Sequence, residues 1–133
     1  MLALTIADCM NKDFAQIRPD LPVVEAASKL IKKETLGGPV TDEKGVLLGW
    51  ISEQECLQVA IQVLYYNQRV ATVQDIMRTD VLTVSLKDDL MLLVQQILQQ
   101  KPKNYPVIDE NRKVLGVVSR RNILKTLDKH WSK

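Results

Sequence analysis

The sequence predicts a fold of short helices and strands in which one unit occurs twice. A shift of 67 positions places residues 5–57 over residues 72–124 without a gap, and 12 of these 53 pairs are identical. We therefore assign a first repeat to residues 1–67 and a second repeat to residues 68–133, packed about a pseudo-twofold axis. The identical positions in the first copy are Thr5, Asp8, Met10, Asp13, Pro39, Val40, Asp42, Glu43, Leu48, Gly49, Ser52 and Leu57.

The length favours two repeats that depend on each other for stability. The chain has 133 residues, of which 46% are hydrophobic and 26% charged, as in ordinary globular proteins. A single copy of about 60 residues buries only a modest core. We expect the two repeats to form one compact module.

The first elements of each copy follow from its apolar spacing. A short helix opens each copy and a strand follows it. Residues 23–31 then carry apolar side chains at helical spacing after Pro22, and residues 90–98 repeat this pattern after two aspartates. Gly37 and Gly38 are expected to end the first of these helices.

The last elements of each copy are a hairpin and a helix. Apolar runs at 39–41 and 46–51 are separated by turn residues, and the second copy has the same arrangement, which predicts paired strands. Ser52 and Ser119 follow these strands, and serine is a favoured residue at a helix N-terminus. Each copy therefore reads helix, strand, helix, strand, strand, helix.

Composition and residue usage argue against several classes of protein. No apolar run approaches the roughly 18 residues of a membrane helix, and the start of the chain lacks the basic region of a signal peptide. His130 is the only histidine, so we expect neither a catalytic triad nor a Cys/His metal site. Cys9 and Cys56 occupy different repeat positions, which favours reduced thiols in the cytoplasm.

Three pairs of motifs resemble a known family. They lie at residues 5–10 and 72–77, at 38–42 and 105–109, and at 48–52 and 115–119. Together and in this order they resemble a tandem pair of CBS domains, a Bateman module. The resemblance implies an α+β fold and a regulatory, non-catalytic role. It also implies that an adenosine-containing ligand, such as AMP, ADP, ATP or S-adenosylmethionine, binds in a cleft between the repeats and that the module signals to a separate protein.

The resemblance also implies where such a ligand binds. A serine at the helix start offers a hydroxyl and exposed amides to phosphate, and the family's ribose-binding Asp is replaced here by Glu55 and by Asn122. Because Arg120 and Arg121 follow Ser119, we expect phosphate there. The predicted ligand-binding residues are Thr83, Tyr105, Pro106, Ser119, Arg120, Arg121 and Asn122, with a second, weaker cleft at Gly38, Pro39, Ser52 and Glu55.

Each of these residues also has a structural interpretation. Ser52 and Ser119 could serve only as helix caps, Thr83 could be a half-buried strand residue, and Tyr105 could pack beside Pro106. The residues from Lys101 onward include nine basic and three acidic side chains, which could form a solvated face. Since no aromatic groove accompanies this charge, we do not expect nucleic acid binding.

The helices predict association of two copies. Their apolar residues offer more surface than short sheets can cover, and such patches mark contact sites. We therefore expect a homodimer and an unidentified regulated protein. The alternative function is a ligand-free dimerisation or interaction scaffold, which the replacement of both ribose-binding aspartates favours. The residues behind this expectation are Leu57, Ala60, Ile61, Leu64, Ile123 and Leu127.

Overall fold

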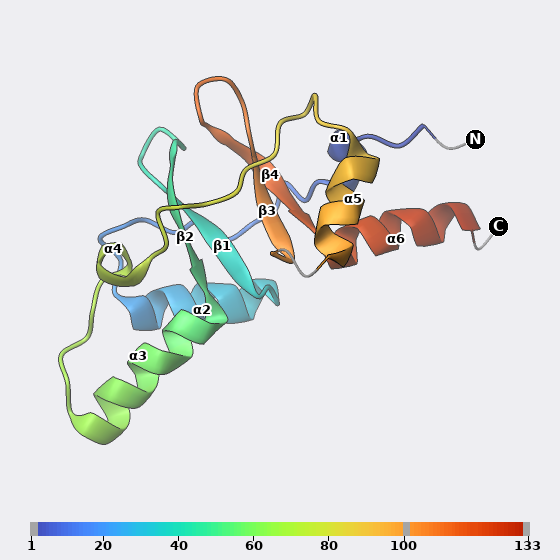
Figure 1. Ribbon diagram of the computed structural model, residues 1–133. Coiled ribbons are helices and arrows are strands. Elements are labelled where there is room, and N and C mark those ends of the chain that lie inside the picture. Colours follow the sequence, from blue (N-terminus) through green and yellow to red (C-terminus); the bar gives the residue numbers. More distant parts are fainter. Residues whose placement is uncertain (1–2, 100–101, 132–133) are drawn as a thin grey trace. The chain divides into compact units, whose positions relative to one another are not determined.

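The computed structural model describes residues 3–99 and 102–131. The chain forms two compact units, which are considered separately (Figure 1). Unit 1 comprises the described parts of Met1–Asp13 and Leu82–Lys133, and unit 2 comprises Phe14–Val81. The units are not the two sequence repeats, because each takes its opening helix from the other repeat.

Unit 2 contains one hairpin and three helices. Strands β1 (Gly37–Thr41) and β2 (Leu47–Ser52) form an antiparallel two-stranded sheet. Helices α2 (Val23–Lys33) and α3 (Glu53–Tyr66) pack against each other beside this hairpin (Figure 1), and the short helix α4 (Val73–Ile76) completes the unit. The hairpin register pairs Gly37 with Ser52 and shifts between Val40 and Thr41.

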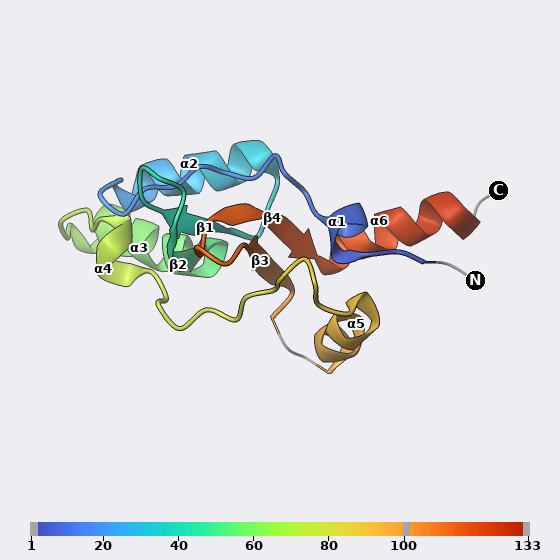
Figure 2. The same ribbon diagram turned by 90° about the horizontal axis from the view of Figure 1, so that it is seen from above.

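Unit 1 repeats this arrangement with its own elements. Strands β3 (Asn104–Ile108) and β4 (Val114–Ser119) form the second antiparallel hairpin. Helix α6 (Arg120–Trp131) follows β4 directly, α5 (Leu90–Leu98) precedes β3, and α1 (Ile6–Cys9) lies beside α6 (Figure 2). The register pairs Asn104 with Ser119 and shifts between Val107 and Ile108, as in unit 2.

The expected first strand of each copy is reduced to a single bridge. Ile17 pairs in parallel with Val40, and Val84 pairs in parallel with Val107. The carbonyl of Ile17 accepts a hydrogen bond from the Thr41 N–H at 3.0 Å. Pro19 follows two residues later and lacks an N–H, so it cannot continue a ladder. The predicted mixed fold with two repeated hairpins is otherwise confirmed.

The first long helix ends earlier than the sequence suggested. Helix α2 stops at Lys33, and Glu34 takes the left-handed conformation with φ of 53°. The two glycines expected to end this helix, Gly37 and Gly38, instead begin β1 and are buried. A side chain at Gly37 would collide with the indole of Trp50, which explains a glycine within this strand.

Each opening helix leads into a backbone bridge within its unit. The Asn11 N–H donates to the Val117 carbonyl at 2.8 Å, and the Val117 N–H donates back to Asn11 at 2.9 Å. In unit 2, Arg78 and Trp50 exchange the same pair of bonds at 2.9 and 2.8 Å. These bridges are why α1 belongs to unit 1 and α4 to unit 2.

Each unit has its own hydrophobic core, formed between its hairpin and its helices. In unit 2 the core residues are Ala15, Ile17, Val23, Ala26, Leu30, Val40, Ile51, Cys56, Val59 and Val73. In unit 1 they are Ile6, Cys9, Val84, Leu90, Leu93, Ile97, Tyr105, Val107, Val118 and Ile123. Most core residues of the two units occupy equivalent repeat positions. The helix that follows each hairpin, α3 or α6, therefore starts in an equivalent place in its own unit.

Candidate functional site

The start of α6 brings four predicted ligand-binding residues together in unit 1. Ser119 is the last residue of β4, and its Oγ accepts a hydrogen bond from the Asn122 N–H at 3.0 Å. Ser119 therefore caps the helix, as the structural interpretation expected. Among the described residues, the Asn122 side-chain amide has no hydrogen-bond partner, and it is half-buried.

Arg120 and Arg121 form an unusual first helical turn. Both side chains are exposed, and the first turn of α6 contains no acidic residue. A helix N-terminus carries partial positive charge, so acidic residues stabilise it and basic residues do not. In α3, the equivalent first turn carries Glu53 and Glu55. The start of α6 is therefore electropositive and that of α3 is not.

The residues expected near adenine lie along β3 of unit 1. The Val84 N–H donates to the Pro106 carbonyl at 3.0 Å, which places half-buried Thr83 beside this strand. Tyr105 is 1% exposed and packs in the core of unit 1, and burial raises the pKa of its phenol. Pro106, the next residue along the strand, is also fully buried.

The equivalent helix start in unit 2 is already engaged. One carboxylate oxygen of Glu55, Oε1, accepts hydrogen bonds from the Ser52 N–H at 2.8 Å and from Ser52 Oγ at 3.1 Å. Its other oxygen, Oε2, lies 3.0 Å from Nε of Arg78 in an ion pair. The sequence predicted Glu55 as a site residue but missed Arg78. The signal was present, because Arg78 and Glu55 align with Asn11 and Asn122 in the other copy.

In unit 2, the space beside the Cα atoms of Gly38 and Gly49 is filled by other side chains of the same unit. A β-carbon at Gly49 would fall 2.8 Å from Sδ of Met77, and one at Gly38 would fall 3.4 Å from Ile17. Gly38 and Pro39 are buried in β1. The close backbone approach that these glycines permit therefore serves packing within unit 2.

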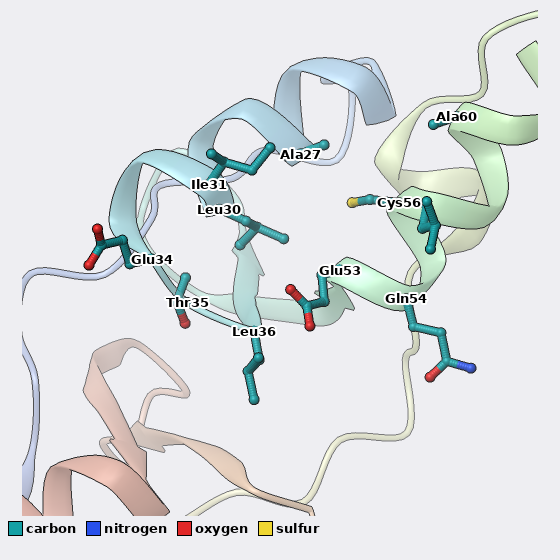
Figure 3. A pocket seen from close by; sticks show the side chains of 11 residues that line it. Ala27, Leu30, Ile31, Glu34, Thr35, Leu36, Glu53, Gln54, Cys56 and Ala60 are labelled. Carbon is teal, nitrogen blue, oxygen red and sulfur yellow. The ribbon is translucent and has the colours of Figure 1, made fainter. Parts of the chain in front are cut away.

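A groove of about 750 Å³ lies between α2 and α3 of unit 2 (Figure 3). Its lining is mainly apolar, and the Cys56 sulfur points from α3 toward α2 (Figure 3). Burial raises the pKa of the thiols of both Cys56 and Cys9. The lining residues are Ala27, Leu30, Ile31, Glu34, Thr35, Leu36, Glu53, Gln54, Cys56, Leu57 and Ala60.

The long helices of both units expose apolar residues seven positions apart. Seven residues make nearly two helical turns, so both members of such a pair lie on one face. These pairs are Val24 and Ile31 on α2, Leu57 and Leu64 on α3, Met91 and Leu98 on α5, and Leu124 and Trp131 on α6, with exposures from 40% to 77%. All four pairs occupy equivalent positions in the two repeats.

Two residues of the predicted dimer face lie elsewhere. Ile123 is 5% exposed and belongs to the core of unit 1, and Leu127 packs against the same core. Their assignment as surface residues was wrong, because the side of α6 that carries them faces its hairpin. Leu57 and Leu64 are exposed as expected, at 64% and 77%, Ile61 is 40% exposed, and Ala60 is half-buried.

Residues 3–99 and 102–131 contain neither a cluster of metal ligands nor a membrane-spanning helix. No group of three or more His, Cys, Asp or Glu side chains in these ranges could hold a metal ion. No helix in these ranges is long and apolar enough to span a membrane.

Comparison with protein families gives two matches along the chain. The family profile of the CBS domain matches residues 6–61 and again residues 73–129. A curated relative, the uncharacterized protein MJ1004 of Methanocaldococcus jannaschii, is 28% identical over 128 residues. This match covers 95% of the present chain and 58% of the relative, so the chain spans less than two thirds of that protein's length.

Two solved structures share the fold and contain ligands. The CBS domain pair of protein MJ0100, in complex with 5′-methylthioadenosine and S-adenosyl-L-methionine, has a TM-score of 0.78 and 24% identity over 96% of this chain and 98% of that one. CBSX2 in complex with AMP has a TM-score of 0.82 and 23% identity, with coverage of 96% and 98%. Both similarities establish the fold of the present chain.

Proposed function

Because the chain belongs to the CBS-domain family, we propose that it is a regulatory module that binds an adenosine-containing ligand and signals to a separate partner protein. The ligand is AMP, ADP, ATP or S-adenosylmethionine, and the module performs no catalysis itself. Related structures with AMP, S-adenosylmethionine and 5′-methylthioadenosine support this ligand class. A cytoplasmic location is part of the proposal, and the free thiols of Cys9 and Cys56 fit it.

The observation that carries the proposal is the start of α6. Ser119, Arg120, Arg121 and Asn122 bring a hydroxyl, two cations and an unpartnered amide to one helix end. We place phosphate near the arginines and ribose near Asn122. Adenine then lies near Thr83 and β3, where Pro106, which is fully buried, supports the strand and does not itself contact the base. Tyr105 would contribute through its backbone, because its ring is inside the core.

Calorimetric titration with AMP, ATP and S-adenosylmethionine tests this placement. A hydrogen bond to a charged group contributes roughly 1.5–3 kcal/mol, so loss of one arginine–phosphate contact should weaken AMP binding about tenfold or more. We expect this loss in Arg120→Ala or Arg121→Ala. Asn122→Asp should strengthen binding, since a carboxylate is the better acceptor for ribose hydroxyls.

The matched control is Glu53→Ala, which changes the residue of unit 2 equivalent to Arg120 and should leave binding by unit 1 unchanged. If both arginine variants bind AMP as tightly as the wild type, the placement at α6 is wrong. If none of the three ligands binds at millimolar concentration, the ligand-binding function itself is wrong.

A second candidate function is dimerisation without a ligand, as a scaffold. The four exposed apolar pairs favour it, because a second copy of the same helix face would cover them. Cyclic dimers are the commonest arrangement of identical chains. A homodimer is compatible with both functions. Light scattering at micromolar concentration should give twice the chain mass of 15.1 kDa, and a monomer mass would contradict it.

A further inference from the structure

Both oxygens of the Glu55 carboxylate in unit 2 already accept hydrogen bonds. Ser52 donates its N–H and its hydroxyl to one oxygen, and Arg78 donates to the other at 3.0 Å. The Glu55 side chain is 19% exposed, whereas that of its ion-pair partner Arg78 is 58% exposed. Three of the roughly four acceptor sites of this carboxylate are therefore taken, and a ribose hydroxyl would have to use the remaining site on Oε2, beside Arg78, or displace one of these donors.

Unit 1 has two neutral amides at the same two positions. Asn122 replaces Glu55, and Asn11 replaces Arg78. The backbone holds Asn11 and Arg78 in equivalent positions. Asn11 exchanges two backbone hydrogen bonds with Val117, and Arg78 exchanges two with Trp50. Asn11 Oδ1 accepts from the Asp13 N–H at 2.9 Å. Its side-chain NH₂ group has no partner among the described residues.

We propose that the Glu55–Arg78 ion pair closes the ligand site of unit 2, and that Asn11, the counterpart of Arg78, belongs to the open site of unit 1. This inference rests on the proposed function and adds the number of ligands that each chain binds. Each chain then binds one adenosine-containing ligand, although it carries two equivalent helix starts.

The chemistry of the two pairs supports this difference. Glu55 is a charged acceptor held by three donors, and breaking charge-assisted bonds is costlier than breaking neutral ones. Asn122 offers one carbonyl acceptor and an NH₂ donor group, and neither is engaged by any of the residues that the structure describes. The guanidinium of Arg78 is larger than the Asn11 amide and is charged, whereas the amide is neutral. Closure is therefore a property of the pair.

Exchange of the two pairs provides the test. Glu55→Asn with Arg78→Asn (E55N/R78N) should open unit 2, and Asn11→Arg with Asn122→Glu (N11R/N122E) should close unit 1. Each unit already contains the pair introduced into the other, so both variants keep side chains that the fold accommodates. Loss of the pair and of the Ser52–Glu55 capping bonds is expected to lower stability, so thermal melting checks that both variants fold.

The readout is the number of ligands bound per chain in a calorimetric titration with S-adenosylmethionine and, separately, AMP. S-adenosylmethionine suits unit 2, because Glu53 at the same helix start repels phosphate. E55N/R78N should bind one more equivalent of S-adenosylmethionine than the wild type. N11R/N122E should lose the wild-type equivalent of AMP.

The control E43N/R69N removes one acid and one base from exposed positions of unit 2 and should bind as the wild type does.

The outcomes separate this inference from the proposed function. If E55N/R78N gains no equivalent, or N11R/N122E binds AMP as the wild type does, the inference is overturned. If the wild type binds nothing but E55N/R78N binds one equivalent, closure by the ion pair is supported and the ligand site in unit 1 is wrong. If neither protein binds either ligand, both proposals fail.

Discussion

The side chain of Met10 lies directly against Gly116, where a β-carbon would overlap with the methionine Cγ and fall 2.9 Å from the Asn11 carbonyl oxygen. Met77 and Gly49 repeat this contact in unit 2. The methionine that closes each opening helix thus occupies the space that a glycine leaves on the second strand. This contact packs the opening segment of each unit, which comes from the other repeat, against the second strand of the hairpin.

Gly116→Ala should therefore destabilise the protein by about 1–3 kcal/mol, the usual cost of forcing an extra carbon into a packed site. Urea denaturation measures the free energy of unfolding. Gly45→Asn is the matched control, because a β-carbon at Gly45 meets nothing within 4 Å and Arg112 already adopts φ of 63° at the equivalent turn position. Equal effects of both substitutions would contradict this account.

Tyr105→Phe should leave the free energy of unfolding unchanged or raise it by about 1 kcal/mol. The Tyr105 hydroxyl is buried and has no hydrogen-bond partner within residues 3–99 and 102–131, and an unsatisfied buried polar group costs about 1–3 kcal/mol. Thermal or urea denaturation checks this, with exposed Tyr66→Phe as the control. A clear loss of stability in Tyr105→Phe would reveal a partner for the hydroxyl.

Leu57→Glu with Leu124→Glu should convert the expected homodimer to a monomer. A buried leucine contributes about 1.5–3 kcal/mol, so loss of each contact should raise the dimer dissociation constant at least tenfold. Light scattering across a concentration series measures the change. Gln58→Glu adds charge to an exposed position next to Leu57 and should leave the mass unchanged. An unaltered dimer in the double variant would place the contact elsewhere.

Native Cys9 and Cys56 should react slowly with iodoacetamide at pH 8. Burial raises the pKa of both thiols above the usual value of 9.0, and only the thiolate is the nucleophile. The raised pKa lowers the thiolate fraction at pH 8, so the native rate should still rise as the pH passes 9.0. The same protein in denaturant supplies the fast reference. Equal rates in both states would contradict the burial of these thiols.

The sequence by itself determined the repeat, the element order and the helix starts at Ser52 and Ser119. Each of these depends on residues within one copy, where spacing and turn chemistry act over a few positions. The same local reading placed Gly37 and Gly38 at a helix end, because it could not see that Trp50 packs against Gly37 from the paired strand.

Only the tertiary structure decided which segments meet. Asn11 bonds to Val117 across 106 positions, and Glu55 pairs with Arg78 across 23. Spacing within one copy does not specify such distant partners, because these contacts join residues that come together only in the folded unit. The physical difference between the two helix starts, an ion pair in one unit and a free amide in the other, therefore became visible only when distant residues were brought within hydrogen-bonding distance.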